Sequence, residues 1–82
     1  MIAIVGYQDG DYNFNLHTAF LVDSVDIAKG HFADALENSS NECRYPYIAL
    51  TIYSDDGKTY IDGDIFKTVE SALEWCEEKC SK

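Results

Sequence analysis

The hydrophobic period of this chain switches between that of a strand and that of a helix, and the order of the switches limits its possible folds. Residues 2–7 are rich in Ile and Val, and apolar residues alternate along residues 14–22, as in strands. Residues 25–37 then place apolar side chains at three- and four-residue spacing, as in a helix. The same order of strand, strand and helix then repeats, at residues 47–53, at residues 59–66 and after Thr68.

The two members of each strand pair are joined by a short segment that contains Asp-Gly, a strong signal for a tight turn between antiparallel strands. These turns lie at residues 9–10 and 56–57. A chain of 82 residues suffices for one domain, so the order ββαββα predicts a single α+β domain over residues 1–82. We expect a four-stranded, mainly antiparallel sheet with both helices packed on one face. The two halves are either an internal repeat or two ordinary hairpin–helix units, and the sequence leaves both interpretations open.

Alternation also predicts which side chains face the helices. One face of the second strand is expected to carry Phe14, Leu16, Thr18, Phe20 and Val22. In the last two strands, the residues expected to face the helices are Ile48, Leu50, Ile52, Ile61 and Ile65. The open face of the sheet is then expected to carry Tyr47, Thr51, Tyr53, Tyr60, Asp62 and Asp64. The first helix is expected to give way to a loop in the polar residues 37–42.

The chain carries 15 acidic and 6 basic residues, a net charge of −9. Such a charge repels nucleic acid and anionic membranes and favours a basic protein partner, although it can also serve solubility alone. The number of cysteines is odd, and the first residues contain neither a basic segment nor a long apolar run. Both features argue against a secreted disulfide framework and a membrane span. We therefore expect a cytoplasmic protein that binds neither nucleic acid nor membranes directly.

No motif in the sequence specifies a reaction. The opening stretch IAIVGYQDGD has the glycines of a nucleotide-binding start, but Gly6 and Gly10 stand alone and the first lysine is Lys29. A second strand, and not a helix, is expected to follow these glycines. The histidines and cysteines offer no pattern of a nucleophile with a positioned base, so we predict that the protein is not an enzyme.

One alternative is a small metal-binding protein. Cys76 and Cys80 lie four residues apart on one helix face, and His17, His31 and Cys43 could complete a tetrahedral zinc site. The same two cysteines fall on the apolar stripe of the last helix, where a free cysteine packs as a small hydrophobic residue. Packing accounts for both cysteines, so we predict no metal and no other cofactor.

The acidic side chains and tyrosines give the most specific prediction, a surface that binds a basic protein. Carboxylates bind arginine and lysine, and tyrosine rings stack on arginine. In size, charge and lack of catalytic residues the chain is similar in kind to the anti-CRISPR and anti-restriction proteins of phages, without a shared motif. This resemblance implies a non-enzymatic inhibitor in the host cytoplasm that occupies its partner's nucleic-acid-binding groove as a DNA mimic. The expected partner-binding residues are Tyr47, Tyr53, Asp55, Asp56, Tyr60, Asp62, Asp64, Glu70, Glu74, Glu77 and Glu78.

Another alternative is an assembly protein. An edge strand presents unpaired backbone groups that can pair with the same strand of a second copy. If residues 2–7 form such an edge, two copies would associate through them as a homodimer.

Overall fold

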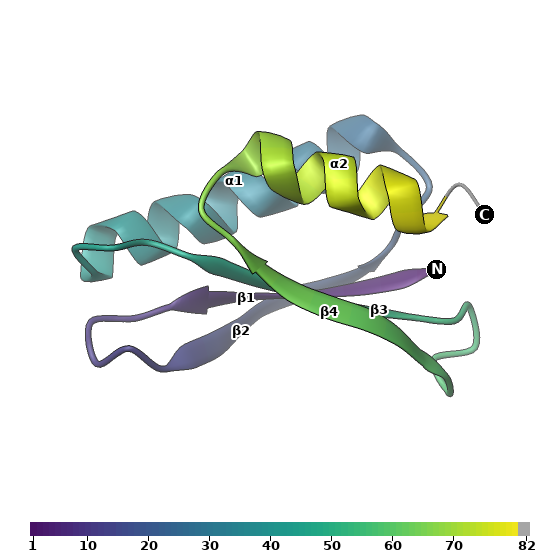
Figure 1. Cartoon of the computed structure of the whole chain (residues 1–82), viewed down its shortest axis with the longest axis horizontal. Helices are drawn as coiled ribbons and strands as arrows, with labels where there is room; N and C mark the ends of the chain where they lie inside the picture. The colour runs from purple at the N-terminus through teal and green to yellow at the C-terminus, as the bar shows by residue number, and fades with distance from the viewer. Residues whose placement is uncertain (81–82) are drawn as a thin grey trace.

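The computed structural model describes residues 1–80 and has the predicted order of elements. Strands β1 (Ile2–Gln8) and β2 (Phe14–Leu21) precede helix α1 (Val25–Glu42). Strands β3 (Ile48–Tyr53) and β4 (Tyr60–Phe66) precede helix α2 (Val69–Cys80). The strands form one antiparallel sheet in the order β2-β1-β3-β4, and both helices lie on the same side of it (Figure 1). The predicted α+β architecture is therefore confirmed.

β1 is a central strand, because it pairs with β2 on one side and with β3 on the other. The backbone N–H and C=O groups of β1 are therefore hydrogen-bonded to a neighbouring strand on both sides. The prediction that residues 2–7 form a free edge is wrong, because the edges are β2 and β4. The pairing of β1 with β3 joins segments more than forty residues apart, as in Ile4 opposite Thr51, and local alternation does not encode it.

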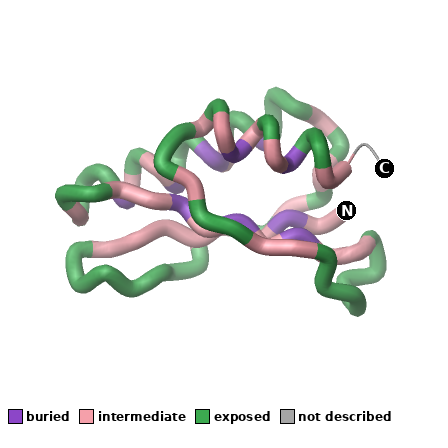
Figure 2. The backbone as a smooth tube through the Cα atoms, viewed as in Figure 1, coloured by how far each residue is buried: buried purple, intermediate pink, exposed green. Residues whose placement is uncertain are grey.

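The core lies between the sheet and the two helices and surrounds Phe32 of α1, which is fully buried. The ring of Phe20 in β2 lies 6.2 Å from the ring of Phe32. The other buried apolar residues are Ala3, Val5, Ala28, Ala35, Ile48, Leu50, Ile52, Ala72 and Cys76. Figure 2 shows the buried stretches of the helices and of the strands facing one another across this layer. The prediction that alternate residues of β3 face the helices is confirmed.

α1 continues through the polar residues that were expected to form a loop, and ends at Glu42. Ser39 is fully buried in its last turns. Its hydroxyl donates to the carbonyl of Gln8 at 2.7 Å and accepts from the backbone N–H of Tyr47 at 3.0 Å. The prediction of a loop at residues 37–42 is wrong because this serine is a buried bridge between the helix and the ends of two strands.

β2 contains a bulge halfway along, which changes the face of the sheet to which its side chains point. Val5 pairs with Thr18 and Gly6 pairs with Leu16, so His17 is an extra residue with no partner of its own in β1. One extra residue moves all following side chains to the opposite face. Thr18 and Phe20 consequently face the helices, whereas Leu16 and Phe14 lie on the open face. The prediction that these residues share one face is wrong for Phe14 and Leu16.

The side chains of β4 also point to the faces of the sheet opposite to those predicted. Asp62, Asp64 and Phe66 lie opposite Ile52, Leu50 and Ile48, so they point to the helix side of the sheet. Ile65 lies opposite Ala49 on the open face, and Ile61 is exposed at a second bulge. The predicted facing is therefore wrong for Asp62, Asp64, Ile61 and Ile65. It is confirmed for Tyr53 and Tyr60, which lie opposite each other on the open face.

Two contacts with α2 account for the facing of β4. The ring of Phe66 packs on Trp75, with ring centroids 5.4 Å apart, and the ammonium of Lys79 lies 2.8 Å from the carboxylate of Asp62. Because β4 is an edge strand, both aspartates still reach solvent. Inward-pointing charges on an edge strand also discourage the edge from pairing with other chains.

Candidate functional site

The structure distributes the predicted partner-binding residues over five places. Four glutamates lie along α2, and Asp62 and Asp64 lie beside that helix on β4. Asp55 and Asp56 lie in the turn between β3 and β4. Tyr53 and Tyr60 lie on the open face of the sheet, and Tyr47 lies in a hollow just before β3.

The glutamates of α2 share its outer face. The helix begins after Thr68, whose hydroxyl oxygen accepts a hydrogen bond from the backbone N–H of Ser71 at 3.2 Å. At about 100° per residue, the four glutamates fall within an arc of about 100° on the side opposite the buried Ala72 and Cys76. All four are exposed: Glu70, Glu74, Glu77 and Glu78.

α1 adds carboxylates that the sequence analysis did not recognise. Asp26, Asp34 and Glu37 are exposed and lie on the side of α1 opposite its buried Ala28 and Phe32. Their spacing in the sequence could have identified them, because these residues repeat at multiples of the helical period outside the apolar stripe. Since α1 and α2 pack against each other, we treat both rows as one acidic helical surface, made of Asp26, Asp34, Glu37, Glu70, Glu74, Glu77 and Glu78.

Asp62 is already engaged within the molecule. The hydrogen bond from Lys79, together with one from the backbone N–H of Gly63 at 2.8 Å, lowers the pKa of the Asp62 carboxyl below its usual value. The same contact raises the pKa of Lys79. Lys29 and Lys79 are the lysines of the two helices, and Lys79 is turned toward β4 by this pair. Lys79 therefore offsets the outer glutamates only in part, through Glu78, which also raises its pKa.

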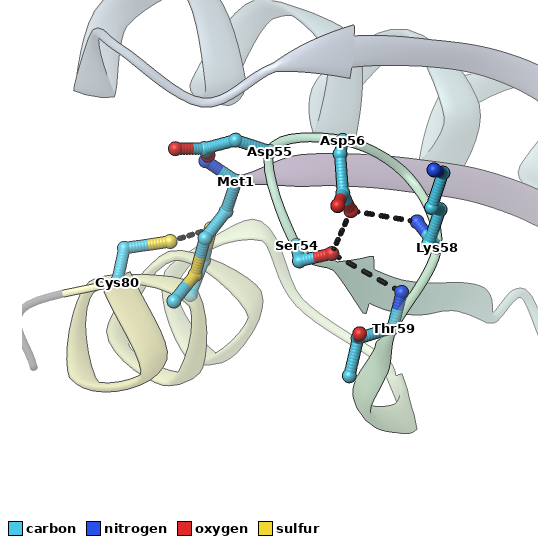
Figure 3. Close-up of polar contacts among 8 residues, drawn as sticks. Met1, Ser54, Asp55, Asp56, Lys58, Thr59 and Cys80 are labelled. Carbon is cyan, nitrogen blue, oxygen red and sulfur yellow. Dashed lines mark hydrogen bonds and ion pairs between the residues drawn. The ribbon is translucent and has the colours of Figure 1, made fainter.

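Asp55 and Asp56 stabilise the turn between β3 and β4 (Figure 3). One oxygen of Asp56 accepts hydrogen bonds from the hydroxyl of Ser54 at 2.6 Å and from the backbone N–H of Lys58 at 2.9 Å. The Ser54 bond is the main cause of the lowered pKa of Asp56. Asp55 forms an ion pair with the amino group of Met1. Both aspartates thus have structural roles that account for their position.

A hollow of about 200 Å³ lies between the start of α1 and the second half of α2. Cys76 and Cys80 line it, with their sulfur atoms 4.0 Å apart. Burial, followed by the neighbouring Cys80, raises the pKa of the Cys76 thiol to about 12. Cys76 is therefore a protonated thiol at neutral pH, and a thiol is a poor nucleophile and metal ligand compared with a thiolate.

A second hollow, of about 220 Å³, surrounds Pro46 at the start of β3. Lys67 lies over the ring of Tyr47, with the ammonium 5.6 Å from its centre, and Arg44 lies over Tyr45 at 5.7 Å. This hollow is basic and aromatic, so Tyr47 belongs to a different environment from the acidic residues predicted to act with it.

Within residues 1–80, no three histidine, cysteine or acidic side chains come close enough together to hold a metal ion. The residues of the metal-binding alternative are separated: His17 lies beside Tyr7 and Asn38, whereas His31 stacks on Phe20. In this same part of the chain, neither helix combines the length and apolar character that a membrane crossing requires.

Comparisons with protein-family models, with curated proteins and with solved structures found no match to this chain. The surfaces of the molecule are therefore the guide to its function.

Proposed function

We propose that the protein is a non-enzymatic inhibitor whose acidic helical surface binds a basic protein in competition with nucleic acid. The observation that supports this most strongly is the one-sided arrangement of exposed carboxylates on the outer faces of two neighbouring helices. Carboxylates and phosphates accept the same charge-assisted hydrogen bonds from arginine and lysine. A dense carboxylate surface therefore competes for a groove that evolved to hold the phosphates of DNA.

The charge pattern of α2 supports binding over stability. Glu70 and Glu74, and likewise Glu74 and Glu78, are like charges four residues apart. Each such pair costs a helix roughly 0.2–0.5 kcal/mol. A helix adapted for stability alone would alternate positive and negative residues at these positions. A surface adapted to a basic partner keeps them negative, and long-range attraction then gives fast association that depends on salt.

The inhibitors that phages direct against CRISPR and restriction systems are the kind of protein that this proposal describes. We place its action in the cytoplasm, the host cytoplasm for a phage-encoded chain, where nucleic-acid-binding enzymes are accessible. Asp62, Asp64 and the tyrosines of the sheet are secondary here, because the structure separates them from the outer helix faces.

The test is affinity capture from a cell lysate with wild-type protein and with Glu74→Lys, which reverses one charge at the centre of the α2 row. We expect the wild type to retain a nucleic-acid-binding protein that rising salt or added duplex DNA releases. We expect Glu74→Lys to weaken binding by about tenfold, because it replaces attraction with repulsion at the contact.

The matched control is Asp11→Lys, which makes the same change of charge at an exposed position in the turn between β1 and β2. It should bind like the wild type. If Asp11→Lys and Glu74→Lys weaken binding equally, only net charge matters and the proposed surface is wrong. If the captured protein resists both salt and DNA, the competition with nucleic acid is wrong.

A further inference from the structure

The face of the sheet turned away from the helices carries no charged side chain. In the pairing register, the residues of β1–β4 that point to this side are apolar, glycine or uncharged polar. They include Ile4 at the centre, Leu16 and Leu21 on β2, Thr51 and Tyr53 on β3, and Ile65 on β4. We call this surface the sheet face. In a chain with a net charge of −9, such a surface is a marked exception.

The sheet face exposes large apolar side chains along its two edge strands. Leu16 is 72% exposed and Leu21 is 61% exposed. Both helices lie on the other side of the sheet (Figure 1). Four strands about 4.8 Å apart and about six residues long give a face of about 400 Å² in projection. The largest apolar patches that soluble monomers expose measure a few hundred Å², and they often mark an interaction site.

Charge identifies the occupant of this face. The acidic helical surface lies on the opposite side of the molecule, so two copies that met there would bring like charges together. Two sheets packed face to face lie about 10 Å apart, with the helices on the two outer sides. The acidic surfaces are then about 30 Å apart, several times the screening distance of about 8 Å in physiological salt. A basic partner, in contrast, finds no carboxylate on this face.

The shape of the face also suits a second copy. Small residues lie around the central Ile4: Gly6 lies opposite both Leu16 and Ala49, and Gly63 lies opposite Thr51. Tyr60 lies over Gly63, since a Cβ added there would lie 3.1 Å from the tyrosine hydroxyl. An uncharged sheet surface can pack against its own copy in the aligned arrangement of two-sheet proteins.

We propose that two copies of this chain pair through their sheet faces, forming a dimer with an acidic helical surface on each outer side. This inference goes beyond the proposed function and does not depend on it. It differs from the pairing of residues 2–7 with a second copy, which the central position of β1 rules out. Two such faces together cover about 800 Å² in projection, which is the size of weak and transient complexes, so we expect a reversible dimer with a dissociation constant on the order of 10 µM.

The test is the mass of the full chain in solution, measured by analytical ultracentrifugation from about 1 µM to about 500 µM, a range chosen to span that constant. The monomer has a mass of 9.2 kDa, and we expect the mass to double as concentration rises. Leu16→Lys and Leu21→Lys each introduce a charge on the sheet face at an exposed edge position. Each should weaken dimerisation by at least about tenfold.

The matched control is Ile27→Lys, because Ile27 is 49% exposed on α1 and the substitution changes the charge equally. It should dimerise like the wild type. A monomer at every concentration would overturn the proposal, as would equal weakening by Ile27→Lys. Growth beyond two copies would also overturn it, because the proposed pair is closed. Circular dichroism spectra like that of the wild type show that a loss of dimer in the variants is not a loss of fold.

Discussion

At the scale of single residues, Ser39 is the polar group on which the junction of helix and sheet depends. It is fully buried, and its hydroxyl uses both a donor and an acceptor, toward the Gln8 carbonyl and the Tyr47 N–H. The same two strand ends bond directly, because the Gln8 N–H donates to the Tyr47 carbonyl at 3.0 Å. One side chain thus fastens α1 to the ends of both central strands.

We predict that Ser39→Ala lowers the free energy of unfolding by about 1–3 kcal/mol, because it leaves a buried N–H and a carbonyl without their partner. The measurement is urea denaturation followed by circular dichroism. Ser40→Ala is the control, since Ser40 is exposed and donates only to the Leu36 carbonyl of its own helix. It should change stability by less than about 0.5 kcal/mol. Equal effects of the two substitutions would contradict the role of Ser39.

At the scale of elements, the turn between β1 and β2 is built to approach the end of α1. The carboxylate of Asp9 accepts hydrogen bonds from the side chain of Asn15 and from the backbone N–H groups of Asn13 and Asp11, which lower its pKa. Gly10 brings the turn against the helix, since a Cβ there would lie 2.7 Å from the carbonyl oxygen of Glu42. A backbone oxygen cannot yield as a flexible side chain can.

We predict that Gly10→Ala destabilises the protein by about 1–3 kcal/mol, because the turn or the helix end must move. Gly30→Ala should have the opposite sign. A Cβ at Gly30 meets nothing within 4 Å in the middle of α1, and alanine stabilises a helix interior by about 1 kcal/mol over glycine. Thermal unfolding of both variants measures the difference. A stabilising Gly10→Ala would show that the turn and the helix end do not touch.

At the scale of the whole molecule, charge is segregated by layer. The outer faces of the helices are acidic and the sheet face is uncharged, although nothing in the residue counts requires this separation.

The stability of the protein depends on pH through the groups whose pKa values change on folding. Three aspartates hold lowered pKa values, and the Cys76 thiol and the Lys79 ammonium hold raised ones: Asp9, Asp56, Asp62, Cys76 and Lys79.

We predict that the protein loses stability at both ends of the pH range, so that its stability profile has an acidic and an alkaline limb. The aspartates release protons more readily when folded, so their contribution is present above their usual value of 3.8 and is lost as pH falls below it. Cys76 and Lys79 hold their protons more tightly when folded. The contribution of Cys76 is therefore present below pH 9.0 and that of Lys79 below pH 10.5, and both are lost as pH rises further. Melting temperatures across this range measure both limbs. Cys76→Ala should make the melting temperature fall less steeply above pH 9.0. An unchanged slope would contradict the contribution of Cys76 to the alkaline loss of stability.

The candidate site could be predicted from the sequence only in part. The row of glutamates on α2 follows from residue spacing, because helical geometry alone places Glu70 and Glu74 on one face. The sheet face could not be predicted, because one bulge at His17 moved Phe14 and Leu16 to it. Bulges arise where two strands pair, and a single strand's sequence does not reveal where its partner skips a residue.

The sequence by itself determined the order and type of the elements, since Asp-Gly turns and hydrophobic periods act over a few residues. It also determined the facing of β3, because Ile48, Leu50 and Ile52 alternate without interruption. Only the tertiary structure decided that β1 is central, that Asp62 turns toward Lys79, and that one face of the sheet is free of charge. These features depend on contacts between distant segments, whose energies become available only when the layers pack.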